Sequence, residues 1–269
     1  KLGSEQAALA KLSEITHQQA AIMAYNDAFH CIGIALGISM LAVLLTRKLP
    51  AGATGGAAAI AGYAIGTWSP SFLIRSHGLN LQQAGFLVGV VGGTGSTIGT
   101  LVCGVLTDRM ARRDAGWQIG VPLLGTLISI PFALAYFLWP QGTAFYIGST
   151  AVPQAFLFYS AFGFFGVWWA TPCLSAITHL FPATRLAQAT AIFVMSMTLL
   201  GVGVGPLFVG MLSDFFVPTL GSESLRYALA GSVSMLVLAS VFLALALPRY
   251  RQQIKQPAAV VNAHASVTA

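Results

Sequence analysis

The sequence predicts an all-α membrane protein with about seven transmembrane helices. Of its 269 residues, 56% are hydrophobic and only 7% are charged, whereas soluble domains carry about 25% charged residues. Residues 115–184, 186–213 and 227–248 contain no Asp, Glu, Lys or Arg, and each stretch is long enough for spans of roughly 20 residues. These stretches are continuously apolar rather than alternating, which predicts helices and not barrel strands.

The expected spans follow one another along the chain at about residues 23–46, 57–74, 81–107, 117–139, 153–181, 186–212 and 225–247. They divide the chain into four parts. Residues 1–50 hold a polar helix and one extra transmembrane helix, and residues 51–60 form a Gly/Ala-rich linker or fusion seam. Residues 61–250 hold six further helices, and residues 251–269 form a disordered tail.

The distribution of Lys and Arg predicts the orientation of these spans. One side of the membrane receives nine of the thirteen basic residues and the other receives four, with unbroken alternation. Because cytoplasmic loops are enriched in Lys and Arg, the nine mark the cytoplasmic side of the cell membrane, where the C-terminus is expected. The same rule explains the net charge of +6 without a nucleic-acid partner.

Few residues suggest enzymatic or metal chemistry. Cys31, Cys103 and Cys173 are scattered inside expected spans, which predicts neither a disulfide framework nor a metal site. Paired acids, His-rich metal spacing and a nucleophile elbow are not found, so neither an intramembrane enzyme nor a cofactor is expected. No signal peptide is expected, and the start at Lys rather than Met suggests a missing upstream part.

A dense cluster of charge separates two long apolar runs at residues 104–113. It contains Gly104, Asp108, Arg109, Arg112 and Arg113. This pattern resembles the loop between the second and third helices of each half of a major facilitator superfamily transporter. The resemblance implies a cytoplasmic loop that caps helix ends and pairs with neighbouring helices in one of two alternating-access states.

The resemblance extends over residues 60–250, which look like the C-terminal six-helix half of spinster-like members. It rests on Trp68 and Pro70 before Arg75, on the charged cluster, and on the Gly205–Pro206 motif that follows Arg185. It implies a secondary transporter of small organic or amphipathic substrates, embedded in the lipid bilayer. In such folds two halves enclose a site near the bilayer midplane.

Residues 1–50 resemble the last helix of the 14-span drug:proton antiporters, through the segment from Gln18 to Phe29 and the basic end after the apolar run. The chain is therefore expected to be partial or fused, with its substrate path completed by a second six-helix half or by a homodimer. Two alternatives stay open: a fragment of a multidrug:proton efflux antiporter, and a non-transporting membrane fragment or scaffold.

Aromatic and cationic residues within the spans are the candidates for the substrate pathway, because ring faces bind apolar or cationic groups and an arginine attracts anions. These are Tyr63, Trp68, Arg75, Trp168 and Trp169. The alternative for the aromatic residues is an interfacial belt. Mid-membrane acids are missing from the last six spans, so Asp108 and Asp214 at helix ends are expected to cap or pair.

Two groups of small residues are expected to shape the helix packing. Gly201, Gly205, Pro206 and Gly210 predict a bending or close-packing element. Gly85, Gly89 and Gly93, followed by Gly95 and Gly99, predict a helix whose backbone approaches its neighbours closely.

Overall fold

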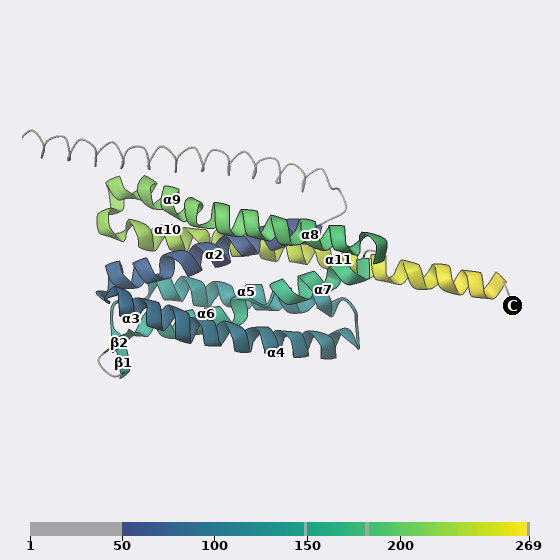
Figure 1. Ribbon diagram of the computed structural model, residues 1–269, viewed down its shortest axis with the longest axis horizontal. Coiled ribbons are helices and arrows are strands. Elements are labelled where there is room, and N and C mark those ends of the chain that lie inside the picture. Colours follow the sequence, from purple (N-terminus) through teal and green to yellow (C-terminus); the bar gives the residue numbers. More distant parts are fainter. Residues whose placement is uncertain (1–49, 148–149, 181–182, 268–269) are drawn as a thin grey trace, which may run out of the picture. The chain divides into compact units, whose positions relative to one another are not determined.

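The computed structural model describes residues 50–147, 150–180 and 183–267. Within these residues the chain forms long helices that lie side by side and a short β-hairpin at one end (Figure 1). The expected span at residues 23–46 and the polar helix before it lie outside the described residues. The resemblance of residues 1–50 to antiporters therefore stays a prediction.

The described helices make six passes. The first three are α2 (Pro50–His77); α3 (Leu81–Phe86) with η1 (Leu87–Gly92) and α4 (Gly93–Ala111); and α5 (Trp117–Leu138). The last three are α6 (Gln154–Gly166) with α7 (Ala170–Leu180); α8 (Ala183–Thr198) with η2 (Leu199–Val204) and α9 (Gly205–Leu220); and α10 (Ser224–Ser232) with α11 (Ser234–Val267).

Five helical stretches of the described chain are long and apolar enough to cross a membrane. The last stretch, Thr184–Gln252, has 69 residues, but it turns back at the 3-10 segment η3 (Gly221–Glu223), after which α10 packs against α9. It therefore supplies two crossings. The six crossings match the six spans expected between residues 57 and 247, and the fold is that of an all-α membrane protein.

The expected linker at residues 51–60 is instead part of helix α2, so this prediction is wrong. Ala57, Ala58 and Ala59 are buried. A Cβ atom at Gly55 would lie 2.8 Å from the Phe193 ring, so the absence of a side chain lets α2 approach α8. Small residues bring helices together inside a membrane, where the backbone must be hydrogen-bonded within the helix. Nothing in this packing bears on whether a fusion seam lies here.

The chain after residue 250 also differs from its expected state. Helix α11 continues to Val267, whereas the sequence predicted a disordered tail from residue 251. Once a helix has formed, each further residue adds one backbone hydrogen bond at low cost. The long preceding part of α11 can therefore extend into the polar tail.

The connection between α5 and α6, expected as an uncharged loop, forms an antiparallel pair of strands. Strand β1 (Thr143–Ile147) pairs with β2 (Thr150–Pro153). The Trp139 indole donates to Gln154 Oε1 at 3.2 Å and closes the hairpin base. Gln141 Nε2 donates to the Ser76 carbonyl at 2.8 Å, which fixes the hairpin to the end of α2.

The turn between α2 and α3 depends on one glycine and one cap. Gly78 has a φ of +68°, a conformation that residues with a Cβ rarely adopt. The Asn80 side chain then accepts a hydrogen bond from the Gln83 backbone at 2.8 Å, and the Gln83 side chain accepts one from the Asn80 backbone at 3.1 Å. This reciprocal capping box fixes the start of α3.

Close packing between α4 and α6 uses other glycines than those at the front of the expected series. A Cβ at Gly99 would collide with the Phe164 backbone, and one at Gly95 would lie 3.3 Å from the Ser160 carbonyl oxygen. At Gly85, Gly89 and Gly93, by contrast, an added Cβ would meet no atom within 4 Å. The expected close approach therefore holds for Gly95 and Gly99 and is wrong for the first three glycines within the described chain.

Candidate substrate pocket

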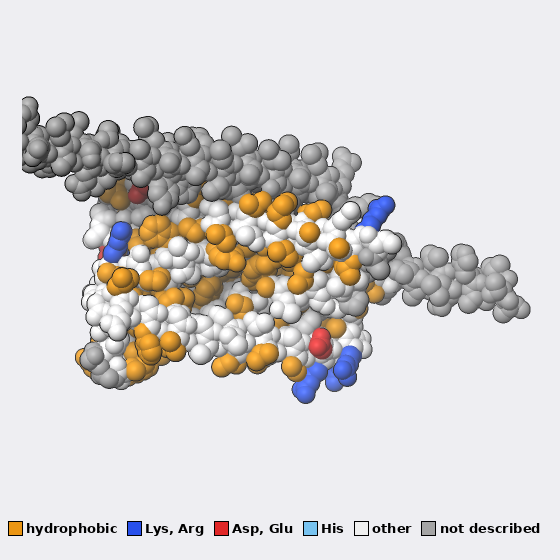
Figure 2. All heavy atoms as spheres, in the orientation of Figure 1, with side chains coloured by type: hydrophobic (Ala, Val, Ile, Leu, Met, Phe, Trp, Pro, Cys, Tyr) orange, Lys and Arg blue, Asp and Glu red, His pale blue; other side chains and the backbone are white. Residues whose placement is uncertain are grey.

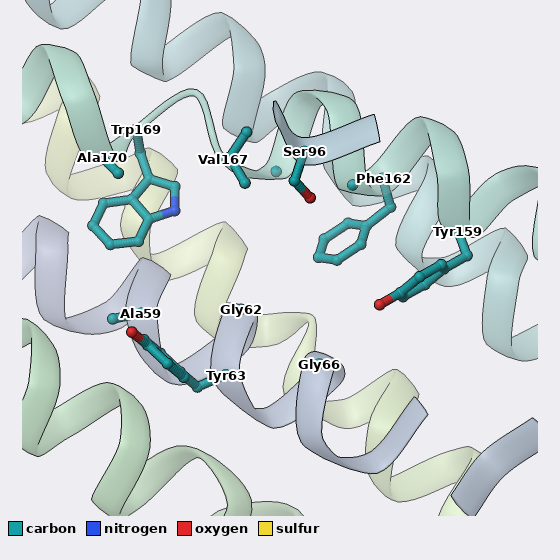
Figure 3. Close-up of a pocket in the computed structure, with 12 residues that line it drawn as sticks. Ala59, Gly62, Tyr63, Gly66, Ser96, Tyr159, Phe162, Val167, Trp169 and Ala170 are labelled. Atoms are coloured by element: carbon teal, nitrogen blue, oxygen red, sulfur yellow. The ribbon is translucent and has the colours of Figure 1, made fainter. Parts of the chain in front are cut away.

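A pocket of about 270 Å³ opens between α2, α4 and α6 (Figure 3). Its lining residues lie near the middle of three membrane-crossing segments. They are Ala59, Gly62, Tyr63, Gly66, Ser96, Tyr159, Phe162, Gly163, Gly166, Val167, Trp169 and Ala170. This is the position at which transporter folds place their substrates.

One wall of the pocket is a single face of α2. Ala59, Gly62, Tyr63 and Gly66 are spaced at i, i+3, i+4 and i+7, which places them in one stripe along a helix. A Cβ atom at Gly62 or Gly66 would meet nothing within 4 Å. The absent side chains therefore widen the pocket, while the Tyr63 ring lies along α2 with its hydroxyl near Ala59 (Figure 3).

The opposite wall repeats the same spacing on α6. Tyr159, Phe162, Gly163 and Gly166 again stand at i, i+3, i+4 and i+7. Figure 3 shows Phe162 and Tyr159 directed toward α2. A small and aromatic stripe on each of two facing helices thus makes a slot with ring faces and hydroxyl groups along its sides.

Each of the two tyrosines rests on a glycine from a π-helical segment. Gly92, the last residue of η1, lies against Tyr159, where an added Cβ would come within 2.7 Å of the ring. An added Cβ at Gly201 in η2 would come closer still to the Tyr63 ring. π-helical turns are rare and frequently accompany functional sites. Here both of them accommodate the aromatic side chains of the pocket.

The chemistry of the lining is neutral. None of the lining residues is Asp, Glu, Lys, Arg or His. Polar groups come from the Tyr63 and Tyr159 hydroxyls, the Trp169 indole and the Ser96 hydroxyl, which donates to the Gly92 carbonyl at 3.0 Å. Such a surface binds apolar and aromatic groups, and a ring face also attracts a cationic group.

The structure brings only two of the five predicted pathway residues, Tyr63 and Trp169, into this pocket. Trp68 donates from its indole to the Pro206 carbonyl at 2.9 Å and joins α2 to α9. Arg75 is exposed at the hairpin end, where it lines a separate cavity of about 590 Å³ with His77 and Gln141.

Trp168 and Trp169 are adjacent in sequence but face different surroundings. The helix is interrupted between Gly166 and Ala170. Trp168 is buried with Cys103, whose thiol donates to the Trp168 carbonyl at 3.3 Å, whereas Trp169 lines the pocket. The sequence analysis grouped the pair, although Gly166 and Pro172 flank this interruption.

The pocket also contains residues that the sequence analysis missed, among them Gly62, Gly66, Ser96, Tyr159 and Phe162. One available signal was the repeated small and aromatic spacing on residues 59–66 and 159–166. The spacing alone does not show that these two helices face each other, which only the fold reveals.

The predicted bending and packing residues all lie along α2. Gly201 contacts Ala59 and Tyr63, and an added Cβ at Gly205 would lie 2.6 Å from the Ile60 carbonyl oxygen. The Pro206 carbonyl accepts the Trp68 indole, and a Cβ at Gly210 would be 3.6 Å from the same indole. These contacts describe a close-packed seam between α2 and the η2–α9 helix.

The charged cluster lies at the opposite end of the bundle from the β-hairpin. Gly104, Asp108 and Arg109 belong to α4, and Arg112 and Arg113 follow it. Charged side chains are found at the two ends of the bundle, and hydrophobic side chains cover much of the face between them (Figure 2). The four charged residues are exposed, and none forms an ion pair within the described part of the chain. Their gating role stays a prediction.

A different acid, Asp114, anchors this end. It accepts hydrogen bonds from the Arg251 guanidinium at 2.6 Å and from the Gly116 backbone N–H at 2.9 Å. Tyr250 donates to the side chain of Gln118 close by. These contacts hold the α4–α5 connection against α11, and the sequence analysis did not single out any of them.

The described residues contain no group of three or more His, Cys, Asp or Glu side chains that could hold a metal ion. Cys103 and Cys173 are buried and unbridged, and Cys31 lies outside the described part. The absence of a metal site and of a cofactor therefore remains an expectation for the whole chain.

The chain is similar to a known protein in sequence and to solved structures in fold. The chain is 33% identical over 199 residues to an MFS-type efflux pump of Mycolicibacterium smegmatis; the match covers 74% of this chain and 44% of the relative. It is also similar to a bacterial homologue of the human lysosomal transporter Spinster. Its inward-facing occupied structure matches with a TM-score of 0.62 and 21% identity, over 75% of this chain and 48% of that chain.

The unoccupied inward-facing structure of that homologue matches with a TM-score of 0.60 and 21% identity, over 76% of this chain and 48% of that chain. No protein-family model matches the chain. Six membrane-crossing helices with a central pocket place the protein in the class of helical transporter folds. The sequence relative and the shared fold make the chain similar to transporters of the major facilitator superfamily. It spans about half the length of the relatives it matches.

Proposed function

We propose that this chain forms one six-helix half of a secondary transporter for small organic or amphipathic substrates. The pocket between α2, α4 and α6 is this half's part of the substrate path. The observation that carries the proposal is a mid-membrane pocket whose walls combine aromatic rings, neutral hydroxyls and glycines. A slot of this kind accepts apolar and aromatic groups without a high desolvation cost.

A second six-helix half, or a second copy of this chain, completes the path. The chain covers 44% of its sequence relative and 48% of its structural neighbours, which leaves room for another half in each. The segment Leu81–Ala111 is the least buried of the membrane-crossing helices. Its unfilled glycines Gly85, Gly89 and Gly93 offer a surface on which another helix can pack closely.

The direction of transport and the orientation in the membrane belong to the same proposal. The sequence relative is named an efflux pump, which favours export over import. The excess of Lys and Arg at the end that carries Arg109 and Arg251 favours a cytoplasmic location for that end and for the C-terminus, in the cell membrane. A non-transporting fragment is the alternative, and direct binding at the pocket discriminates against it.

The test is binding of ethidium, an aromatic cation, to the chain purified in detergent. Gly62→Leu places an aliphatic side chain in open pocket space and is expected to weaken binding roughly tenfold or more, because it occupies the slot. The matched control is Ala244→Leu, at an exposed position on α11 outside the pocket lining. Equal binding by Gly62→Leu, Ala244→Leu and the unchanged chain would contradict the proposal.

A further inference from the structure

A second cavity, of about 490 Å³, lies at the end of the bundle where α4 meets α5. It is lined by Arg109 and Met110 from the last turn of α4, by Arg112 and Arg113 from the connection, and by Trp117 at the start of α5. Three arginines therefore line one hollow, within a segment of nine residues. This cavity is separate from the central pocket and shares no lining residue with it.

The positive charge of this cavity is not neutralised by an ion pair in the described chain, although Asp108 lies beside Arg109 on α4. Its lining contains no carboxylate, and none of the three arginines has an Asp or Glu oxygen within 4.0 Å. The acid that follows them, Asp114, is already engaged by Arg251 and by the Gly116 backbone. Like charges that share a cavity repel one another, and an anion bound among them relieves this repulsion.

The geometry of arginine and the position of the cavity narrow the choice of anion. The planar guanidinium presents two parallel N–H donors that match the oxygens of a phosphate. Because α4 and α5 are membrane-crossing helices, the cavity at their junction lies at the level of the lipid headgroups. Trp117 lines it and also packs against the buried cluster around Val121, as expected of an indole at the membrane interface.

We propose that this cavity binds the phosphate headgroup of an anionic phospholipid, with the three arginines holding the phosphate and with Met110 and Trp117 contacting the apolar part of the lipid. An excess of basic residues on one side of a membrane can arise from topology alone. Arg185 and Arg249 serve that purpose at the same end and do not line this cavity. The proposal therefore rests on convergence of charge and not on its amount.

The test measures phosphatidylglycerol retained by the full chain in native mass spectrometry, after purification into detergent with a fixed phosphatidylglycerol and phosphatidylcholine mixture. The Arg112→Gln/Arg113→Gln variant removes two charges from the cavity. The Arg185→Gln/Arg249→Gln variant removes two charges at the same end outside it. Neither Arg112 nor Arg113 makes a side-chain hydrogen bond in the described chain, so the first variant is expected to fold.

We expect the cavity variant to bind phosphatidylglycerol roughly tenfold or more weakly, and the control variant to stay within about threefold of the unchanged chain. Equal losses in the two variants would overturn the proposal, because they would mean that total charge and not the cavity retains the lipid. A separate arm adds inorganic phosphate. Displacement of the lipid by phosphate at equal concentration would overturn the assignment to a lipid in favour of a soluble phosphate ligand.

Discussion

The central pocket and the cavity at the α4–α5 junction are both lined by residues of α4, but the first lining is neutral and the second is positively charged. Ser96, in the first turn of α4 and near the middle of the Leu81–Ala111 crossing, belongs to a neutral slot of glycines and aromatic rings. Arg109, one helix end away, belongs to a hollow lined by three arginines. Glycines open the first cavity by omitting side chains, whereas the second is defined by the charges it gathers.

This difference shows that small residues and charged residues have different structural roles in a membrane protein. Lipid is as apolar as the helix surface, so helices are held together by close approach at small residues. The identity of each glycine therefore determines where a slot can form. Charged residues are confined to helix ends, where they determine orientation and the contacts with headgroups.

The largest expected effect concerns the charged end of α4. Arg109→Ala is predicted to abolish substrate flux in a complete transporter containing this half, while membrane insertion is retained, because the loop is expected to pair with neighbouring helices in one transport state. The measurement is flux of a fluorescent substrate into proteoliposomes at equal protein abundance. Arg249→Ala is the control, and flux in Arg109→Ala equal to that of the control would contradict the gating role.

A large loss of stability is expected where the central slot depends on close packing. Gly99→Ala forces a Cβ atom against the Phe164 backbone and should lower the free energy of unfolding by about 3 kcal/mol. The measurement is thermal unfolding in detergent. Gly93→Ala, six positions earlier, meets no atom within 4 Å and should be neutral or slightly stabilising. A reversed order of the two variants would refute the assignment of the close contact to Gly99.

A smaller effect is expected from the glycine that supports an aromatic wall. Gly201→Ala places a methyl group against the Tyr63 ring and should displace that ring, with a loss of ethidium affinity of about tenfold. Gly203→Ala, two positions along the same π-helical segment, is the comparison. Unchanged affinity in Gly201→Ala would mean that Tyr63 does not contact the ligand.

The smallest effect is expected at the exposed ion pair beside the arginine cavity. Both partners of the Asp114–Arg251 pair have a side-chain exposure of 45%, so solvent screens their attraction. Asp114→Asn should therefore lower the free energy of unfolding by at most about 1 kcal/mol, and less in high salt. Asp214→Asn, at an exposed position outside both described ion pairs, serves as the control. A loss several-fold larger would mean that this pair does more than join α11 to the loop.

The sequence predicted the number of crossings in residues 57–247 because continuous apolar runs and basic helix ends are strong signals. It placed Tyr63 and Trp169 among the pathway residues, and both line the pocket. It did not anticipate that Trp168 would turn into the α4–α5 core, because Gly166 and Pro172 on either side of the interruption do not indicate which way each tryptophan faces.

The errors share one physical origin. A run of Gly and Ala has the composition of a flexible linker in water, yet residues 55–59 form a buried part of α2. Gly85, Gly89 and Gly93 have the spacing of a packing stripe, yet Gly95 and Gly99 make the close contacts with α6. Small residues predict that a neighbouring helix packs closely, but they do not identify that helix. The fold is needed to identify it.

The most direct test of the central claim is the accessibility of the pocket in a chain whose three native cysteines are replaced by alanine. A cysteine introduced at Ser96 should react with a water-soluble thiol reagent, and ethidium should protect it. A cysteine at Val241, an exposed position on α11 outside the pocket lining, should show no such protection. Equal protection at both positions, or none at Ser96, would contradict the assignment of this pocket to the substrate path.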